Sequence, residues 1–148
     1  MPMTDRPIRN VLVIDGQGGQ LGSQLIRALR ARLPEVNVTA VGTNAAATAA
    51  MLKAGADRAA TGENPVLVAC RKADAILGPI GIVVADALCG EVTPAMARAV
   101  GQAEGTRILL PMQKCETLVA GVAPQNTAAL VADAAEKLAA LAQKSSLA

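Results

Sequence analysis

The chain has 148 residues, a length that suits a single domain, and its formal net charge is +2. Hydrophobic residues make up 52% of the chain and supply a core, although Phe, Tyr and Trp are all absent. Scattered basic residues and the lack of aromatic stacking surfaces argue against nucleic-acid binding. No uninterrupted apolar run reaches the roughly 18 residues of a membrane span, and the first residues lack a signal peptide's apolar segment. We therefore expect a cytoplasmic protein that does not contact a membrane.

The predicted elements alternate between strands and helices. A first strand at 11–15 runs into a glycine-rich turn, and the next helix places Leu21, Leu25 and Leu29 on one face before Pro34 ends it. Further strands are predicted at 36–41, 56–60, 73–77 and 106–110, with an antiparallel candidate at 118–122. A second helix is predicted to end at about 54, with Gly55 after it, and a third to run from Pro65 to about 70, with Asn64 as its cap. Further helices are predicted at 82–88, at 94–102 with Thr93 as cap, and from Asn126 or Thr127 onward.

This alternation predicts an α/β fold with a sheet covered on both faces. We expect a single-domain, Rossmann-like three-layer sandwich with a mostly parallel sheet of five or six strands. The domain spans 1–148, with a loose leader at 1–9 and a loose tail at 144–148. The apolar surface of an aromatic-free chain suggests a homodimer or higher oligomer.

The turn after the first strand carries regularly spaced glycines, Gly16-x-x-Gly19-x-x-Gly22, with Gly18 in addition. It fits the G-x-G-x-x-G fingerprint loosely and is closer to the G-x-x-G-x-x-G variant of extended short-chain dehydrogenases. Glycines permit close approach of a ligand, and the N–H groups that open the next helix attract anions. We expect a nucleotide or other phosphate-bearing small ligand here; the alternative is a tight turn without a ligand. The candidate binding residues are Asp15, Gly16, Gln17, Gly18, Gly19, Gln20 and Gly22.

Polar or glycine-containing segments also follow the other predicted strands. Because ligands bind beyond the carboxyl ends of parallel strands, we expect these segments to form one pocket, although each alone is ordinary turn sequence. The candidate binding residues are Thr43 and Asn44 after the second strand, Thr61, Gly62, Glu63 and Asn64 after the third, and Gly78, Pro79, Ile80 and Gly81 after the fourth. The segment after the fifth strand is Gln113, Lys114 and Cys115.

The residues leave the identity of the ligand, and of any nucleotide or dinucleotide cofactor, open. An NAD site has an acidic residue at the end of the second strand, where this chain has Gly42, Thr43 and Asn44. An NADP site has an Arg or Lys nearby, and after the second strand this chain has neither before Lys53. An adenine dinucleotide in its usual pose is therefore disfavoured, although Thr43 and Asn44 suit a second phosphate or a ribose. Asp15 could hold a ribose hydroxyl, hold Mg²⁺ beside a phosphate, or cap the turn.

Catalytic groups are sparse, since the chain has no His and no Tyr. The missing Tyr excludes short-chain dehydrogenase chemistry, and the missing Lys-Ser/Thr pair after the glycines excludes P-loop phosphoryl transfer. The candidate reactive groups are Cys115 beside Lys114, Glu63 beside Asn64, and Asp86 with Glu91. A neighbouring ammonium favours a thiolate at Cys115, but a structural cysteine there and solvent-side charges at Asp86 and Glu91 are the alternatives.

The three cysteines, Cys70, Cys89 and Cys115, are odd in number and widely spaced, which is typical of reduced thiols in a cytoplasm. Cys70 and Cys89 lie in apolar, helix-like stretches and are expected to be small core residues. Without a C-x-x-C pair or any His, we expect no metal site.

Several successive segments form a set: VIDGQGG at 13–19, GTNA at 42–45, MLKAGAD at 51–57, ATGEN at 60–64, GPIG at 78–81 and GEVTP at 90–94. This set resembles a short bacterial family known only as a domain of unknown function, over about Val11 to Val122. The resemblance implies a small Rossmann-like protein without an established activity, and it supplies no catalytic residues.

Together these observations favour a binding protein for a phosphate-bearing small ligand over a catalyst. One alternative is a small thiol-dependent or sulfur-handling enzyme that uses Cys115. Another is a non-catalytic subunit of a larger assembly, which the apolar helices predicted between 82 and 100 suggest.

Overall fold

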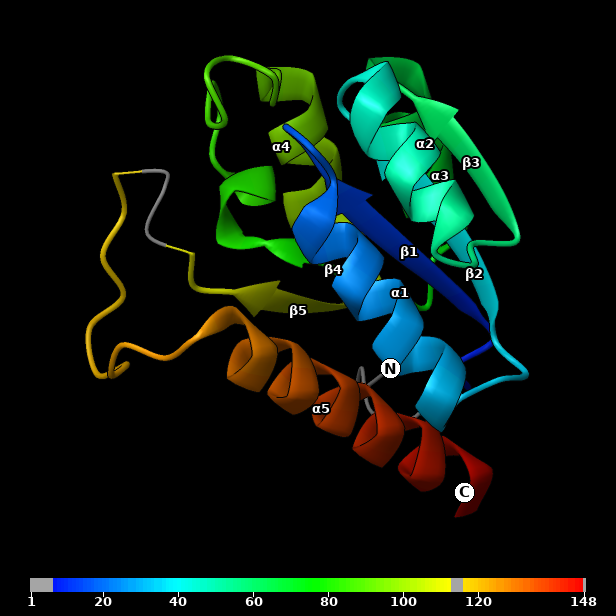
Figure 1. The fold of residues 1–148 in the computed structure, drawn as a ribbon. Helices are drawn as coiled ribbons and strands as arrows, with labels where there is room; N and C mark the ends of the chain where they lie inside the picture. Colours follow the sequence, from blue (N-terminus) through cyan, green and yellow to red (C-terminus); the bar gives the residue numbers. More distant parts are fainter. Residues whose placement is uncertain (1–6, 113–115, 148) are drawn as a thin grey trace.

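The computed structural model describes residues 7–112 and 116–147, and of residues 145–147 only the backbone. These residues form a sheet of five parallel strands in the order β3-β2-β1-β4-β5 (Figure 1). The strands are β1 (Asn10–Asp15), β2 (Asn37–Gly42), β3 (Arg58–Thr61), β4 (Ala75–Pro79) and β5 (Thr106–Leu110). The predicted single-domain, Rossmann-like α/β fold is confirmed, and the strand order reverses between β1 and β4.

Helices cover both faces of the sheet. They are α1 (Gln20–Arg32), α2 (Ala45–Lys53), α3 (Glu63–Lys72), the 3₁₀ helix η2 (Ile80–Val83), α4 (Pro94–Gln102) and α5 (Thr127–Leu147). Buried residues of α1, α2 and α5 pack on one face, where Figure 1 shows α1 and α5 side by side, and those of α3, η2 and α4 pack on the other. No helix of the described residues is long and apolar enough to span a membrane.

The central strand β1 supplies both cores, because successive side chains of a strand point to opposite faces. Val11 and Val13 pack with α1 and α5, whereas Leu12 and Ile14 pack with α3 and α4. All four side chains are at most 2% exposed. A strand that is buried on both sides reads as a continuous apolar run, which is why this strand was predictable.

The predicted helix starts are partly correct. Thr93 caps α4 as expected, because its side-chain oxygen accepts the N–H of Met96, and Asn44 caps α2 in the same way by accepting the N–H of Ala47. The prediction for α3 was wrong, because Gly62 precedes its first residue and Asn64 lies inside the helix. Its proline is the third helical residue, where the backbone N–H would have no partner within the helix, so a proline is tolerated. Similarly, β4 starts two residues later than predicted and includes Gly78 and Pro79.

The predicted helix at 82–88 is wrong. The chain forms the short η2 and then a series of turns, in which Asp86, Leu88 and Cys89 have positive φ angles of 68°, 56° and 56°. Apolar residues in this stretch suggested a helix, but they pack individually: Leu88 is buried against the α3 and α4 side. Cys89 is exposed, so its prediction as a core residue was also wrong.

The predicted strand at 118–122 is also wrong, since those residues form no strand. The segment runs outside the sheet between β5 and α5 (Figure 1), and Leu118 is 87% exposed. A short apolar run forms a strand only if it has a neighbouring strand with which to pair, and within the described part of the chain none adjoins this one. At the other end of the chain, α5 continues through 144–147, where a loose tail was expected.

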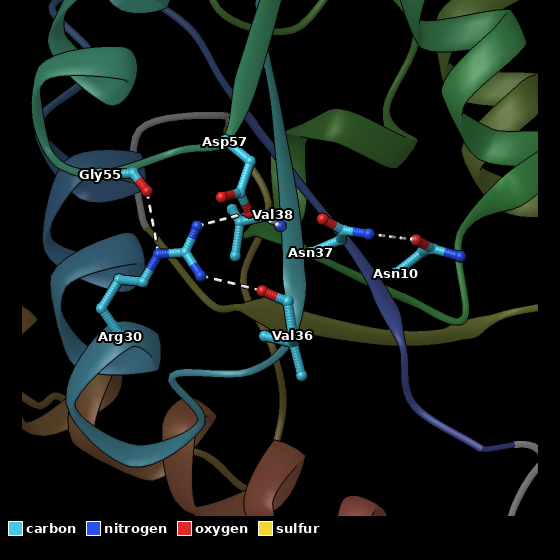
Figure 2. Close-up of polar contacts among 7 residues, drawn as sticks. All are labelled: Asn10, Arg30, Val36, Asn37, Val38, Gly55 and Asp57. Carbon is cyan, nitrogen blue, oxygen red and sulfur yellow. Dashed lines mark hydrogen bonds and ion pairs between the residues drawn. The ribbon is translucent and has the colours of Figure 1, made fainter.

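Arg30 of α1 joins two connections at the amino end of the sheet, the one before β2 and the one before β3 (Figure 2). The guanidinium of Arg30 donates to the backbone oxygens of Gly55 and Val36, both at 2.9 Å, and to the carboxylate of Asp57. That carboxylate also accepts the N–H of Val38 at 2.8 Å. These bonds fix α1 to the starts of β2 and β3, at the end of the sheet opposite the glycine-rich turn.

Candidate functional site

Asp15, the last residue of β1, caps the start of α1. Its Oδ1 accepts the N–H of Gly16 and its Oδ2 accepts the N–H of Gly22, both at 2.8 Å. Burial raises the pKa of Asp15, and the charge of Glu91 adds to this, although the N–H bonds act in the opposite direction. Of the roles that the sequence left open for Asp15, this geometry matches capping of the turn.

Three of the four glycines in the turn are packed against protein. A Cβ on Gly16 would lie 2.6 Å from the Thr43 hydroxyl, and one on Gly22 would lie 2.5 Å from the sulfur of Met51. Gly19 has a φ of +73°, which favours glycine, and lies against the backbone of α2. A Cβ on Gly18 would meet only a side-chain carbon of Gln20, at 4.0 Å, so Gly18 is the glycine that faces open space.

The outer side of the turn exposes backbone donors. Gln17, Gly18 and Gln20 are exposed, and Gln20 is the first residue of α1. Among the described residues, no acceptor is found for the N–H groups of Gly18 and Gln20. These two donors lie at the start of α1, where the positive end of the helix dipole is located. Both effects favour the binding of an anion.

Glu91 connects the turn to the end of β2. Its Oε1 accepts the N–H of Gln17 at 3.1 Å, the hydroxyl of Thr43 and the side-chain amide of Asn44 at 2.8 Å. The Thr43 hydroxyl bond lowers the pKa of Glu91 most, and the bonds from Gln17 and Asn44 act in the same direction. Asn44 additionally donates to the backbone oxygen of Gln17 at 2.9 Å. The alternative that Glu91 is a mere solvent-side charge is therefore wrong, whereas Asp86 is exposed.

A cleft of about 370 Å³ lies beside the turn. The residues around it come from the carboxyl ends of β1 and β4 and from the starts of α1 and α5, so it occupies the point where the strand order reverses. Ligands of open parallel sheets bind at this point. The lining residues are Asp15, Gly16, Gln17, Gly18, Gly19, Gln20, Leu21, Gln24, Pro79, Leu88, Met112 and Thr127.

Other predicted site residues lie outside this lining. Thr43 and Asn44 adjoin the turn through Glu91. Glu63 accepts the hydroxyl of Thr93 at 2.7 Å and so supports the cap of α4. Gly62 and Asn64 flank it at the start of α3, and the Thr61 hydroxyl pairs with that of Thr48. Gly78 is a β4 residue packed against Ile14, and Ile80 and Gly81 belong to η2.

The candidate thiol Cys115 and its neighbours Gln113 and Lys114 lie outside the described residues. Met112, immediately before them, lines the cleft. Within 7–112 and 116–147, no group of three His, Cys, Asp or Glu residues could hold a metal ion.

The sequence did not mark Glu91 as the link between loops, and it did not mark five of the cleft residues, which are Leu21, Gln24, Leu88, Met112 and Thr127. Gln24 was accessible in principle, since it lies four residues after Gln20 and so on the same face of α1. Glu91 had no such signal, because its partners lie 47, 48 and 74 residues away in the sequence.

Comparison with known proteins gives a family and no activity. No curated protein and no solved structure matches the chain. One family does match, over residues 10–143. The match extends past Val122, where the resemblance seen in the sequence ended, and includes most of α5. The chain therefore belongs to the family described as a domain of unknown function, DUF3842.

Proposed function

We propose that this protein binds a phosphate-bearing small ligand, such as a nucleotide, in the cleft beside the glycine-rich turn. The observation that carries the proposal is the position of the cleft, at the reversal of strand order between β1 and β4. Its volume of about 370 Å³ lies toward the small end of the range of ligand sites, which is about 300–1,000 Å³. A mononucleotide or a smaller phosphate ester therefore suits it better than a dinucleotide.

Two helix starts support an anionic ligand. Gln20 is the first residue of α1 and Thr127 is the first residue of α5, and both line the cleft. Each helix has the positive end of its dipole at this point, so the two fields add inside the cleft. The exposed N–H groups of Gly18 and Gln20 supply hydrogen bonds for phosphate oxygens.

The buried carboxylate of Asp15 limits where the phosphate can bind. Asp15 already accepts the N–H groups of Gly16 and Gly22, and it is only 6% exposed. The phosphate is therefore expected over Gly18 and Gln20, on the outer side of the turn, and not in the position that Asp15 fills. The amide side chain of Gln24, which also lines the cleft, can hydrogen-bond the remainder of the ligand without a charge.

Substitution of Gly18 tests this proposal without disturbing the fold, because Gly18 has room for a side chain and does not have a positive φ. In Gly18→Asp the new carboxylate would repel a phosphate and fill its position. The control is Gly101→Asp, an exposed glycine in α4 that also has open space around it.

The measurement is calorimetric titration with inorganic pyrophosphate and with nucleoside monophosphates. We expect the wild type and Gly101→Asp to bind at least one of these probes with equal affinity, and Gly18→Asp to lose roughly tenfold or more. Equal binding by all three proteins would place the ligand elsewhere, and the absence of binding to the wild type at millimolar concentrations would contradict the proposal.

A further inference from the structure

The glycine-rich turn already carries carboxylates of its own chain on its backbone donors. Asp15 accepts the N–H groups of Gly16 and Gly22, and Glu91 accepts the N–H of Gln17. Carboxylate and phosphate oxygens compete for the same donors, because both are anionic acceptors of backbone N–H groups. The turn therefore holds internal anions at positions next to the N–H groups that remain open.

These two carboxylates differ in how firmly they are held. Asp15 is a buried residue of the central strand β1. Glu91 belongs to the connection between η2 and α4 and is partly exposed. Its hydrogen bonds to the turn and to the end of β2 all use one oxygen, Oε1. Rotation of this one side chain would release the Gln17 N–H without any change in the sheet.

The backbone beneath Glu91 has a fixed shape. Asp86 donates its N–H to the backbone oxygen of Val92 at 2.7 Å, and Val92 donates to Ala87 at 3.1 Å. The side chains of Leu88 and Val92 are also buried in the core. The hydrogen bonds and this burial together fix the turn of 86–92. The contact between Glu91 and Gln17 is consequently made or broken by the side chain of Glu91 and not by movement of a loop.

We propose that Glu91 is an internal competitor for the ligand's anionic group: it occupies the N–H of Gln17 in the empty protein, and a phosphate that spreads from Gly18 onto Gln17 must displace it. This inference rests on the proposed function, and it assigns to Glu91 the control of anion affinity at that site. Displacement also frees the hydroxyl of Thr43 and the one N–H of the Asn44 side-chain amide that Glu91 accepts, while the same amide still donates to the backbone oxygen of Gln17.

The test compares pyrophosphate affinity in the wild type, Glu91→Gln and the control Glu35→Gln. Glutamine keeps an oxygen that can accept the same bonds but removes the charge. Glu35 is an exposed acid between α1 and β2, at the opposite end of the sheet, and its substitution makes the same change in net charge. Calorimetry gives the affinities, and NMR follows the side-chain amide of Asn44 during each titration.

We expect Glu91→Gln to bind pyrophosphate roughly tenfold more tightly than the wild type and Glu35→Gln, because a nearby like charge is removed. In the wild type, saturation should shift the Asn44 amide resonances as Glu91 leaves them. Wild-type binding with no gain in Glu91→Gln, or with unchanged Asn44 resonances, would overturn the competition and leave the proposed function intact. If none of the three proteins binds pyrophosphate, the proposed function fails and the competition fails with it.

Discussion

The carboxylate of Asp15 accepts the N–H of Gly22 at 2.8 Å, so the last residue of β1 caps the helix that begins five residues later. A second oxygen of the same carboxylate accepts the N–H of Gly16. One side chain thus satisfies donors on both sides of the glycine-rich turn. This contact fixes the turn without a ligand and leaves the donors of its outer side available.

Removal of the Asp15 side chain should therefore destabilise the fold. Asp15→Ala leaves the N–H groups of Gly16 and Gly22 without their acceptor, which should lower the free energy of unfolding by about 1–3 kcal/mol. Urea denaturation of Asp15→Ala and the wild type measures this difference. A change below a few tenths of a kcal/mol would show that the cap contributes little.

The pH dependence of stability should also carry the signature of Asp15. Burial raises its folded-state pKa above the ordinary value of 3.8, so the folded state binds the proton more tightly than the unfolded state. Its contribution is present below 3.8 and is lost as the pH rises through the raised value. The free energy of unfolding of the wild type minus that of Asp15→Asn should therefore fall with rising pH above about 4. A difference that rises with pH would have the wrong sign for this account.

Two glycine-to-alanine substitutions in helices should have opposite effects. In α1, a Cβ on Gly22 would meet the sulfur of Met51 and the Cβ of Asp15, so Gly22→Ala should lower the free energy of unfolding by about 1–3 kcal/mol. In α4, Gly101 has open space, and Gly101→Ala should raise it by roughly 0.5–1 kcal/mol. Thermal or urea denaturation distinguishes the two, and effects of the same sign would contradict the close packing of α1 on β1.

The bonds of Arg30 at the amino end of the sheet should be stabilising (Figure 2). Arg30→Ala removes its donors from the backbone oxygens of Gly55 and Val36 and from Asp57, which should lower the free energy of unfolding by about 2 kcal/mol. Arg27→Ala is the matched control, because Arg27 is an exposed arginine of the same helix, and its effect should stay within about 0.5 kcal/mol. Denaturation curves for both variants test the difference; equal effects would mean that Arg30 acts only through helix propensity.

Periodic patterns of apolar residues made most of the fold predictable. Residues 11–14 of β1 are buried on both faces and read as an unbroken apolar run, and the leucines of α1 recur at intervals of four. The capping side chain of Thr93 marked the start of α4 because its bond is local in sequence, and Asn44 makes a bond of the same local kind at the start of α2. The glycines of the first turn likewise marked the connection from β1 to α1.

What could not be predicted depends on partners far apart in the sequence. Glu91 reaches the turn only because the strained residues Asp86, Leu88 and Cys89 direct the chain there, and no local pattern marks them. The segment at 118–122 is a short apolar run like a strand, but among the described residues it has no strand beside it. Gly22 of α1 was predicted from the glycine spacing to contact a ligand. In the structure it packs against Met51 and Asp15, and these neighbours cannot be identified from the spacing.

Binding of an anion over Gly18 and Gln20 can be located residue by residue in an NMR titration of the ¹⁵N-labelled wild type with inorganic pyrophosphate. We expect saturable shifts that are largest for the backbone N–H resonances of Gly18 and Gln20, while the resonance of the Gly22 N–H, which Asp15 holds, shifts little. Saturable shifts centred on another part of the sheet, or a spectrum that does not change at millimolar pyrophosphate, would contradict it.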